Sequence, residues 1–299
     1  MNLDLTLVKA KWIVQESTDL EVVKASLLGE GNDFVSYLIN DEWVFRFPKS
    51  WANADKLLHE REFLKALTIP VRTPRFKYWE TNPSGYPVPV AGYRIIRGDI
   101  LESLQPESCD AASLAIEIAD VLGVLHGHRT KSVPNQSERT DYWLQQSNDD
   151  LWIGLDEFSR EEIEEAQAFL NQYRNDSNQA SKDVVVIHGD LGVEHIITDG
   201  ARHLRGIIDW SNSCLGNRFF DFIGLWGWGG DEFVVESLCH YGAMPDSSEW
   251  ALIRSWGLIY CIGRYKLAHA RNRTTNIATR TRLRKRIEEV AGTRLYAEP

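Results

Sequence analysis

The 299-residue sequence has few cysteines and no long apolar run, and both absences narrow the class of protein. Its four cysteines are scattered and include no C-x-x-C pair; they are Cys109, Cys214, Cys239 and Cys261. This spacing favours neither a zinc cluster nor a disulfide framework, so we expect free thiols in a reducing compartment. No stretch approaches the ~20 apolar residues of a membrane span. Because the first residues include an acid where a signal peptide would be basic, we expect a cytoplasmic protein with no membrane partner.

The sequence also lacks an excess of basic residues. Its 33 Lys and Arg against 43 Asp and Glu give a net charge of -10, which argues against a protein built to hold nucleic acid. The one basic cluster lies near the C-terminus and contains Arg280, Arg282, Arg284, Lys285 and Arg286. No aromatic residues are interleaved with it, so we expect a surface helix with intramolecular partners. The length and the 43% hydrophobic content predict a large core and two lobes.

The most informative stretch is an apolar run followed by His-Gly-Asp. Val184 to Ile187 predicts a buried strand, and His188-Gly189-Asp190 follows at its end. Two further short strands are expected after it, and the second delivers Asp209. Asp190, His195 and Asp209 would then lie at neighbouring strand ends. Phosphoryl transfer uses such a set, with one carboxylate to accept the hydroxyl proton and further ligands for Mg²⁺ on the nucleotide phosphates.

This segment resembles the catalytic loop of the aminoglycoside and macrolide phosphotransferases, whose fold is similar to that of protein kinases. Their motif is His-Gly-Asp, then Asn or His five residues after the Asp, then a strand ending in Ile-Asp-Trp or Ile-Asp-Phe. The matching residues are His188-Gly189-Asp190, His195 and Ile208-Asp209-Trp210. The resemblance implies that Asp190 is the catalytic base and that His195 and Asp209 bind Mg²⁺. It also implies that His188 and Asp221 support the loop, although Asn217-Arg218 replaces the family's Asp-Pro before Asp221.

The first third of the chain predicts an antiparallel sheet with two helices. The helices are expected at residues 5–13 and Asp55–Leu67. The strands are expected at Glu21–Leu28, Phe34–Ile39, Trp43–Phe47, Phe76–Glu80 and Tyr93–Arg97.

Two short segments of this region resemble the nucleotide site of the 2''-aminoglycoside phosphotransferases. Gly29 and Gly31 lie in a hairpin turn whose backbone N–H groups would approach the triphosphate. The segment with Arg94, Ile95 and Ile96 resembles the hinge whose backbone groups bind the purine. Backbone recognition does not distinguish ATP from GTP. We expect the boundary between the lobes just after this hinge.

A third feature shared with that family is a basic residue on the third strand. The family's lysine clamps the α/β-phosphates, and the matching residue is Arg46, as in the macrolide phosphotransferases, with Lys49 as the competing candidate. Glu60 matches the helix glutamate that pairs with this base. From the residues alone, Arg46 could instead face solvent, since the aromatic residues beside it point to the opposite face of the strand.

Beyond the hinge we expect a mostly helical lobe. Its predicted helices are Ser113–His126, Asp141–Leu155, Glu161–Tyr173 and Arg254–His269. The third has an acidic face of the kind that is usually solvated, although the family holds amino-sugar ammonium groups with acids near its cleft. The candidate acceptor residues are Glu194, Trp228, Asp231 and Glu232, and Trp228 could equally belong to the core.

Together these features predict a bilobal α+β protein-kinase-like fold. An antiparallel five-stranded lobe, residues 1–98, would bind nucleotide, and a mostly helical lobe, residues 99–299, would carry the catalytic loop and acceptor site. The expected activity is Mg²⁺-dependent transfer of the γ-phosphate of ATP or GTP to a hydroxyl of an aminoglycoside, a cationic antibiotic, by a monomer. Such a transfer inactivates the antibiotic and gives resistance.

Three alternatives stay open. The residues of the catalytic segment, His-Gly-Asp and Ile-Asp-Trp, together with Arg46, favour a macrolide 2'-phosphotransferase. A kinase of a small metabolite alcohol, such as choline or homoserine, is another possibility. The intact Asp190 and Asp209 argue against a nucleotide-binding pseudoenzyme.

Overall fold

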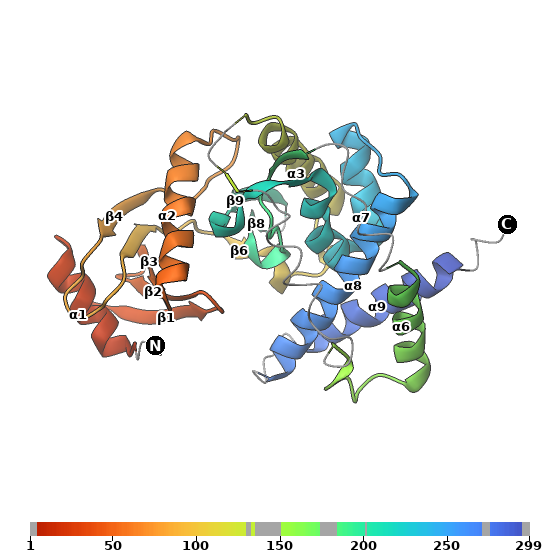
Figure 1. Cartoon of the computed structure of the whole chain (residues 1–299), viewed down its shortest axis with the longest axis horizontal. Helices are drawn as coiled ribbons and strands as arrows, with labels where there is room; N and C mark the ends of the chain where they lie inside the picture. Colours follow the sequence, from red (N-terminus) through yellow and green to blue (C-terminus); the bar gives the residue numbers. More distant parts are fainter. Residues whose placement is uncertain are drawn as a thin grey trace. The chain divides into compact units, whose positions relative to one another are not determined.

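In the computed structural model the chain divides into two compact units, each with its own sheets (Figure 1). The first comprises Met1–Arg97 and Gly206–Asn212, and the second comprises Gly98–Arg205 and Ser213–Pro299. The structure describes residues 5–129, 133–134, 151–173, 184–200, 202–270 and 276–294.

A five-stranded antiparallel sheet forms the first unit, as expected. The strands are β1 (Ala25–Glu30), β2 (Phe34–Ile39), β3 (Trp43–Pro48), β4 (Phe76–Glu80) and β5 (Val90–Arg94). Their spatial order is β1-β2-β3-β5-β4, and every neighbouring pair is antiparallel. Short turns join β1, β2 and β3, and such turns connect antiparallel neighbours.

The edges of two strands differ from the expectation. β1 begins at Ala25 instead of Glu21, and β5 begins at Val90 instead of Tyr93. The segment after β5 leaves the ladder: the Ile95 N–H donates to the carbonyl of Glu42 at 2.8 Å. The sequence pattern therefore placed the fifth strand too far along the chain. Prolines lie just before Val90, and because proline is disfavoured within a strand, the residues beside them were not assigned to it.

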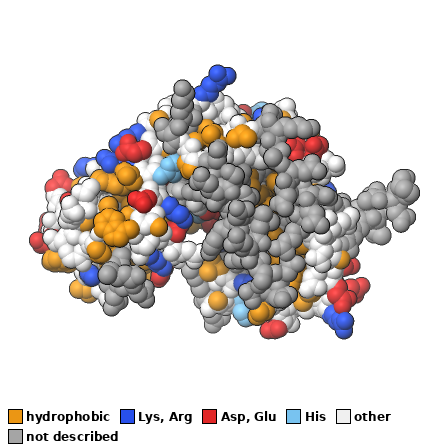
Figure 2. All heavy atoms as spheres, viewed as in Figure 1, with side chains coloured by type: hydrophobic (Ala, Val, Ile, Leu, Met, Phe, Trp, Pro, Cys, Tyr) orange, Lys and Arg blue, Asp and Glu red, His pale blue; other side chains and the backbone are white. Residues whose placement is uncertain are grey.

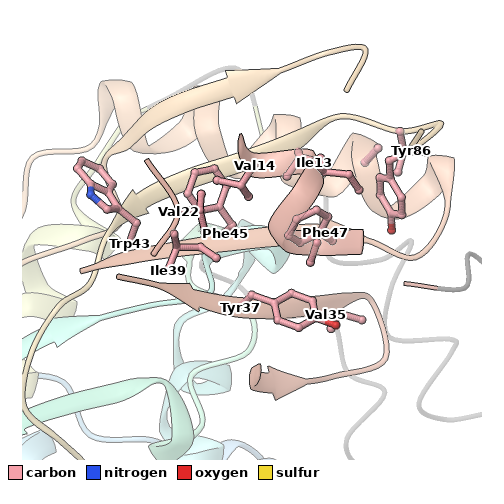
Figure 3. Close-up of a cluster of buried hydrophobic side chains, with 14 residues drawn as sticks. Ile13, Val14, Val22, Val35, Tyr37, Ile39, Trp43, Phe45, Phe47 and Tyr86 are labelled. Atoms are coloured by element: carbon pink, nitrogen blue, oxygen red, sulfur yellow. The ribbon is translucent and has the colours of Figure 1, made fainter. Parts of the chain in front are cut away.

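One face of the sheet packs against α1 (Leu7–Ser17). Buried side chains of this helix, among them Ile13 and Val14, meet the inward-facing aromatic side chains of β2 and β3 (Figure 3). The ring of Phe47 makes edge-to-face contacts with Tyr37 and Tyr86, with centroid distances of 5.7 and 5.6 Å. This aromatic cluster is the main hydrophobic core of the unit.

The other face of the sheet is covered by α2 (Trp51–Ala66). Ser50 caps the helix by accepting a hydrogen bond from a first-turn N–H, so α2 begins earlier than the sequence pattern predicted. Glu60 of α2 is fully buried against the sheet, and Arg46 of β3 is only 4% exposed. Because α2 covers this face, the solvent-facing alternative for Arg46 is wrong.

Charges on the surface of the first unit are mixed in sign. In Figure 2, Lys and Arg side chains lie next to Asp and Glu side chains over this unit. Lys24 pairs with Asp41 at 2.8 Å and Arg94 with Glu42 at 2.9 Å. Exposed pairs of this kind stabilise a protein by only about 0.5 kcal/mol each. Stability of the unit therefore depends on its interior.

Helices dominate the second unit. They are α3 (Ala111–His126), α6 (Arg160–Tyr173), α7 (Ile223–Tyr241), α8 (Ser247–Ala270) and α9 (Asn276–Arg294). α3 packs on α7, α7 on α8, and α9 on both α8 and α6. The predicted helix Asp141–Leu155 lies largely outside the described residues. Within the described ranges, none of the helices has the length and apolar character needed to cross a membrane.

Short strands complete the second unit. The strands β6 (Asp99–Ile100), β8 (Ile196–Asp199) and β9 (His203–Ile207) form one sheet in the order β6-β8-β9. β7 (Val184–Ile187) pairs antiparallel with β10 (Cys214–Asn217). The segment that joins β7 to β8 is the predicted catalytic loop, and its two ends are therefore fixed by different sheets.

The basic helix α9 has intramolecular partners, as its composition predicted. Arg280 forms an ion pair with Glu157, and Arg284 forms one with Glu162 of α6. The acidic face of α6 is thus used in part to hold α9.

We expect Phe47→Ala to lower the free energy of unfolding of the first unit by about 3–5 kcal/mol, because it leaves a cavity among packed aromatic rings. Urea denaturation followed by circular dichroism measures the change, and hydrogen exchange with mass spectrometry locates it. The matched control is Val8→Ala, at a side chain that is 79% exposed. An unchanged urea midpoint for Phe47→Ala would contradict the packing described.

Candidate active site

The His-Gly-Asp loop of the second unit is held from behind by one buried carboxylate. Asp221 lies in a 3-10 turn, η6 (Arg218–Phe222), and is fully buried. Its two oxygens accept hydrogen bonds from the backbone N–H groups of His188 (2.8 Å) and Gly189 (2.9 Å). Gly189 has φ +77°, a left-handed conformation that favours glycine. Asp221 therefore makes the backbone contacts expected of a loop support.

A histidine of α3 extends this support. His126 Nε2 lies 3.2 Å from Asp221, and its Nδ1 lies 2.8 Å from the hydroxyl oxygen of Tyr241 at the end of α7. The buried ring of His188 stacks on that of His195, with a centroid distance of 6.1 Å. The loop is thus connected to the ends of two helices, while the half-buried Asp190 follows immediately after its fixed backbone.

The ring of His195 is hydrogen-bonded to the backbone of Asp190. His195 Nδ1 lies 2.8 Å from the Asp190 carbonyl oxygen, and since a carbonyl only accepts, Nδ1 carries the proton. The lone pair then lies on Nε2, which is the arrangement of a metal-binding histidine. His195 ends a short 3-10 turn, η4 (Val193–His195).

The first unit contains a cluster of a buried arginine, a buried carboxylate and a half-buried one. Arg46 donates from Nη1 to Glu60 and from Nη2 to Asp209 at 2.9 Å. The guanidinium also lies over the ring of Phe34, 4.0 Å from its centroid. The second oxygen of Glu60 accepts from the backbone N–H of Trp210 at 3.2 Å. The expected Arg46–Glu60 pair is therefore present, and Asp209 joins it.

Neighbouring carboxylates stabilise the charged form of Arg46. Burial alone would lower the pKa of Arg46, but the neighbouring Asp209 and Glu60 raise it above its ordinary value. The same burial raises the pKa of the nearby Tyr93 hydroxyl. Asp209 has φ +62°, an unusual conformation for a residue with a side chain, and it accepts a further hydrogen bond from Ser211 at 2.9 Å. Such backbone strain of about 1–3 kcal/mol is typical of functional residues.

The glycines of the first hairpin leave open space. Gly29 lies next to an irregularity in the β1–β2 pairing, and the Gly31 N–H donates to the Phe34 carbonyl at 3.0 Å. A Cβ added to either glycine would contact nothing within 4 Å. Packing therefore does not require glycine here, whereas close approach of a phosphate would favour it. Lys49 pairs with Glu30 in this hairpin rather than with Glu60.

The three expected hinge residues differ in their contacts and in their burial. The N–H of Ile95 is used by the Glu42 carbonyl, and the exposed Arg94 side chain pairs with Glu42. Ile96 is buried against Gly206, where an added Cβ would lie 2.7 Å from the Ile96 side chain.

Two of the four candidate acceptor residues make contacts within the helical unit. Trp228 is 1% exposed and donates from Nε1 to the Leu104 carbonyl at 3.0 Å. The cavity that it lines measures about 10 Å³, room for about one water molecule. Asp231 accepts hydrogen bonds from Trp226 and Arg254, where Gly230 interrupts α7 with φ +71°.

The other two candidates differ in exposure. Glu232 is exposed, whereas Glu194 is half-buried and paired with Arg264 at 2.9 Å. Arg264 was not predicted from the sequence. Its partners Glu102 and Glu194 are 162 and 70 residues away, so no local pattern could have indicated it.

Each unit contains one of the two residues that were predicted to bind Mg²⁺. Asp209 of the first unit offers a carboxylate, and His195 of the second offers an imidazole nitrogen. In the part of the chain that the structure describes, no group of three or more His, Cys, Asp or Glu side chains could hold a metal ion. Mg²⁺ usually takes one or two protein ligands and completes its shell with water and phosphate oxygens. The Asp209 carboxylate therefore fits an Mg²⁺ ion that is bound together with a nucleotide.

Solved structures share this architecture over nearly the whole chain. That of APH(2'')-IIIa in complex with GDP and kanamycin is 21% identical, with a TM-score of 0.70, and the match covers 98% of this chain and 100% of the other. The streptomycin–ATP complex of APH(2'')-IIa is 17% identical, with a TM-score of 0.57 and coverage of 94% and 96%. Macrolide 2'-phosphotransferase type I is 18% identical, with a TM-score of 0.62 and coverage of 95% and 99%.

The shared fold and the motif on the β7–β8 loop define a kinase-like phosphotransferase. The model of the phosphotransferase enzyme family matches residues 24–254, which is well over half of the sequence. The chain belongs to this family. The expected bilobal, kinase-like α+β fold is confirmed.

We expect Asp221→Ala to lower the free energy of unfolding by about 3 kcal/mol or more, since it leaves two buried N–H groups and His126 without an acceptor. The urea midpoint of the full chain measures this change. Asp120→Ala is the control, because Asp120 pairs with His240 at the exposed surface and its loss should cost less than about 1 kcal/mol. Equal midpoints for the two variants would contradict the supporting role of Asp221.

Proposed function

We propose that this chain transfers the γ-phosphate of ATP or GTP to a hydroxyl group of an aminoglycoside antibiotic, and so confers resistance by inactivating it. The observation that carries the proposal is the cluster of the buried Arg46 and Glu60 with the half-buried Asp209. It combines a fixed cation for phosphate oxygens with a carboxylate suited to Mg²⁺. A cluster that served only stability would not need a strained Asp209.

In the proposed reaction the first unit binds the nucleotide. Residues 1–98 supply Arg46, oriented by Glu60, for the α/β-phosphates, and the Gly29–Gly31 hairpin covers the triphosphate. The backbone at residues 94–96 contacts the purine. Arg46 has a fork of donors where a lysine would have a single ammonium group, so it can hold a carboxylate and a phosphate oxygen together.

Residues 99–299 supply the catalytic loop. Asp190 orients the acceptor hydroxyl and takes its proton as the oxygen attacks the γ-phosphorus. Asp209 and the Nε2 atom of His195 are the residues that would hold Mg²⁺, which supplies neutralisation of phosphate charge. Because the transition state is largely dissociative, positioning dominates the rate. A loop whose backbone is fixed by Asp221 suits that requirement.

The identity of the acceptor is proposed from the likeness to other enzymes and from charge. Kanamycin and streptomycin occur in the complexes of the two similar aminoglycoside phosphotransferases. Both are cationic, and a net charge of -10 suits such an acceptor, as it would a macrolide. The likeness to a macrolide 2'-phosphotransferase keeps a macrolide as the second candidate. The proposal does not rely on Trp228 or Asp231, whose contacts lie within the helical unit.

An acceptor panel tests the proposal directly. We expect nucleotide turnover in the presence of Mg²⁺ to rise at least tenfold with a kanamycin-type acceptor, and mass spectrometry to find one added phosphate on it. The panel includes macrolides, choline and homoserine, each with ATP and with GTP. Stimulation by small alcohols alone would contradict the antibiotic acceptor. Stimulation by macrolides alone would select the second candidate.

The role of Asp190 is tested by removing its carboxylate. We expect Asp190→Ala to lower kcat by about a hundredfold or more, which is the scale of general-base loss, with little change in the urea midpoint. Asp199→Ala is a matched control, because Asp199 lies at the end of the neighbouring strand β8 and pairs with Arg205 at the exposed surface. Wild-type turnover by Asp190→Ala would remove this residue from the mechanism.

A further inference from the structure

A half-buried carboxylate of the predicted catalytic loop, next to His195, is held by two residues of the helical unit. The side chain of Glu194 is only 18% exposed and accepts hydrogen bonds from two residues of α8, Tyr260 and Arg264. A carboxylate with these partners is directed into the helical unit.

The ion pair continues to a third segment. Arg264 also donates to Glu102, in the 3-10 turn η1 (Leu101–Ser103) that follows β6. A second arginine, Arg282 of α9, donates to the carbonyls of Glu102 (2.6 Å) and Leu104 (2.8 Å). The catalytic loop, η1 and α8 are therefore tied together by one chain of charged hydrogen bonds.

The catalytic loop contains a glycine beside the Glu194 carboxylate, where a side chain would collide with it. A Cβ on Gly192 would lie 2.2 Å from the Glu194 carboxylate, so any larger residue would displace it. A Cβ on Gly224, at the start of α7, would lie 2.4 Å from the Leu191 carbonyl oxygen. These close approaches leave little freedom in how the loop passes behind Asp190.

The direction of Glu194 determines the direction of His195. The two residues are neighbours in η4, and side chains that follow one another in a 3-10 helix are about 120° apart around its axis. Val193 is buried and Glu194 points to α8, so the third direction is left for His195, whose Nδ1 meets the Asp190 carbonyl. Stability alone does not explain the ion pair between Glu194 and Arg264, because a protein with apolar residues in place of such a pair is often at least as stable.

We infer that Glu194, held by Tyr260 and Arg264, is a positioning residue that fixes the 3-10 turn η4 and so the orientation of His195 beside Asp190. This inference rests on the proposed function for its catalytic consequence. It replaces the expectation that Glu194 contacts the acceptor. The claim about the orientation of His195 concerns the protein alone.

The tautomer is measured first, on the full chain without nucleotide or metal. Two-dimensional ¹H–¹⁵N spectra of the imidazole groups identify the protonated nitrogen, and His195→Gln assigns the signals. We expect the Nδ1–H form with a single set of signals in the wild type, and shifted or doubled His195 signals in Glu194→Gln, where the ring is no longer held in one orientation. Glu157→Gln is the matched control, because Glu157 pairs with Arg280 elsewhere in the same unit. Unchanged His195 signals in Glu194→Gln would overturn the inference.

Kinetics then separate positioning from acceptor binding. With the best acceptor of the panel, Glu194→Gln should lower kcat by about tenfold or more and raise the Mg²⁺ concentration for half-maximal activity by a similar factor, as loss of an outer-shell partner does. The acceptor KM should stay within about twofold. A raised acceptor KM with unchanged kcat would overturn the inference, since it would place Glu194 in contact with the acceptor.

Two further results separate failure of the inference from a folding defect and from failure of the proposed function. If Glu194→Gln does not fold, Tyr260→Phe removes only the hydroxyl and should shift the His195 signals and kcat in the same direction by a smaller factor; no shift would overturn the inference. If the wild type turns over no acceptor, the proposed function fails, and the spectra still decide whether Glu194 positions His195.

Discussion

The buried guanidinium of Arg46 is the constraint on which the first unit depends. A charge taken out of water costs several kcal/mol unless it is paired and hydrogen-bonded. Its partners Glu60 and Asp209 come from segments 14 and 163 residues away along the chain, so the cost is offset only when α2, β3 and the end of β9 are all in place. The same pairing attaches Gly206–Asn212 to the unit that binds nucleotide in our proposal.

Arginine at this position has a consequence that lysine would not have. An ammonium group is a point charge that can turn between partners, whereas a guanidinium offers separate nitrogens in a rigid plane. In this protein Nη1 meets Glu60, Nη2 meets Asp209, and the flat face covers Phe34. The plane of the guanidinium therefore fixes both carboxylates relative to each other, which restricts the orientation of the Asp209 side chain.

Local patterns in the sequence predicted most strands, and a motif next to a strand indicated the candidate catalytic residue. β2, β4 and β7 coincide with apolar β-branched and aromatic runs, and Asp190 was proposed from its position after such a run. The start of β5 was misplaced because prolines precede it. The partners of buried charges could not be predicted in the same way. Arg264 and Asp231 have ordinary neighbours in sequence, and only tertiary packing brings Arg264 to Glu194 and Arg254 to Asp231.

The catalytic loop combines backbone that is fixed with side chains that remain accessible. Asp221 holds the N–H groups before Asp190, and the pair of Glu194 with Arg264 holds the residue before His195. Support on both sides of a short loop leaves few conformations for the residues between them, so little entropy is lost when substrates bind. In a reaction with little covalent chemistry for the protein to perform, that prior ordering is the main contribution that a loop can make. The buried charges around the loop are then explained by the geometry that they impose rather than by the stability that they add.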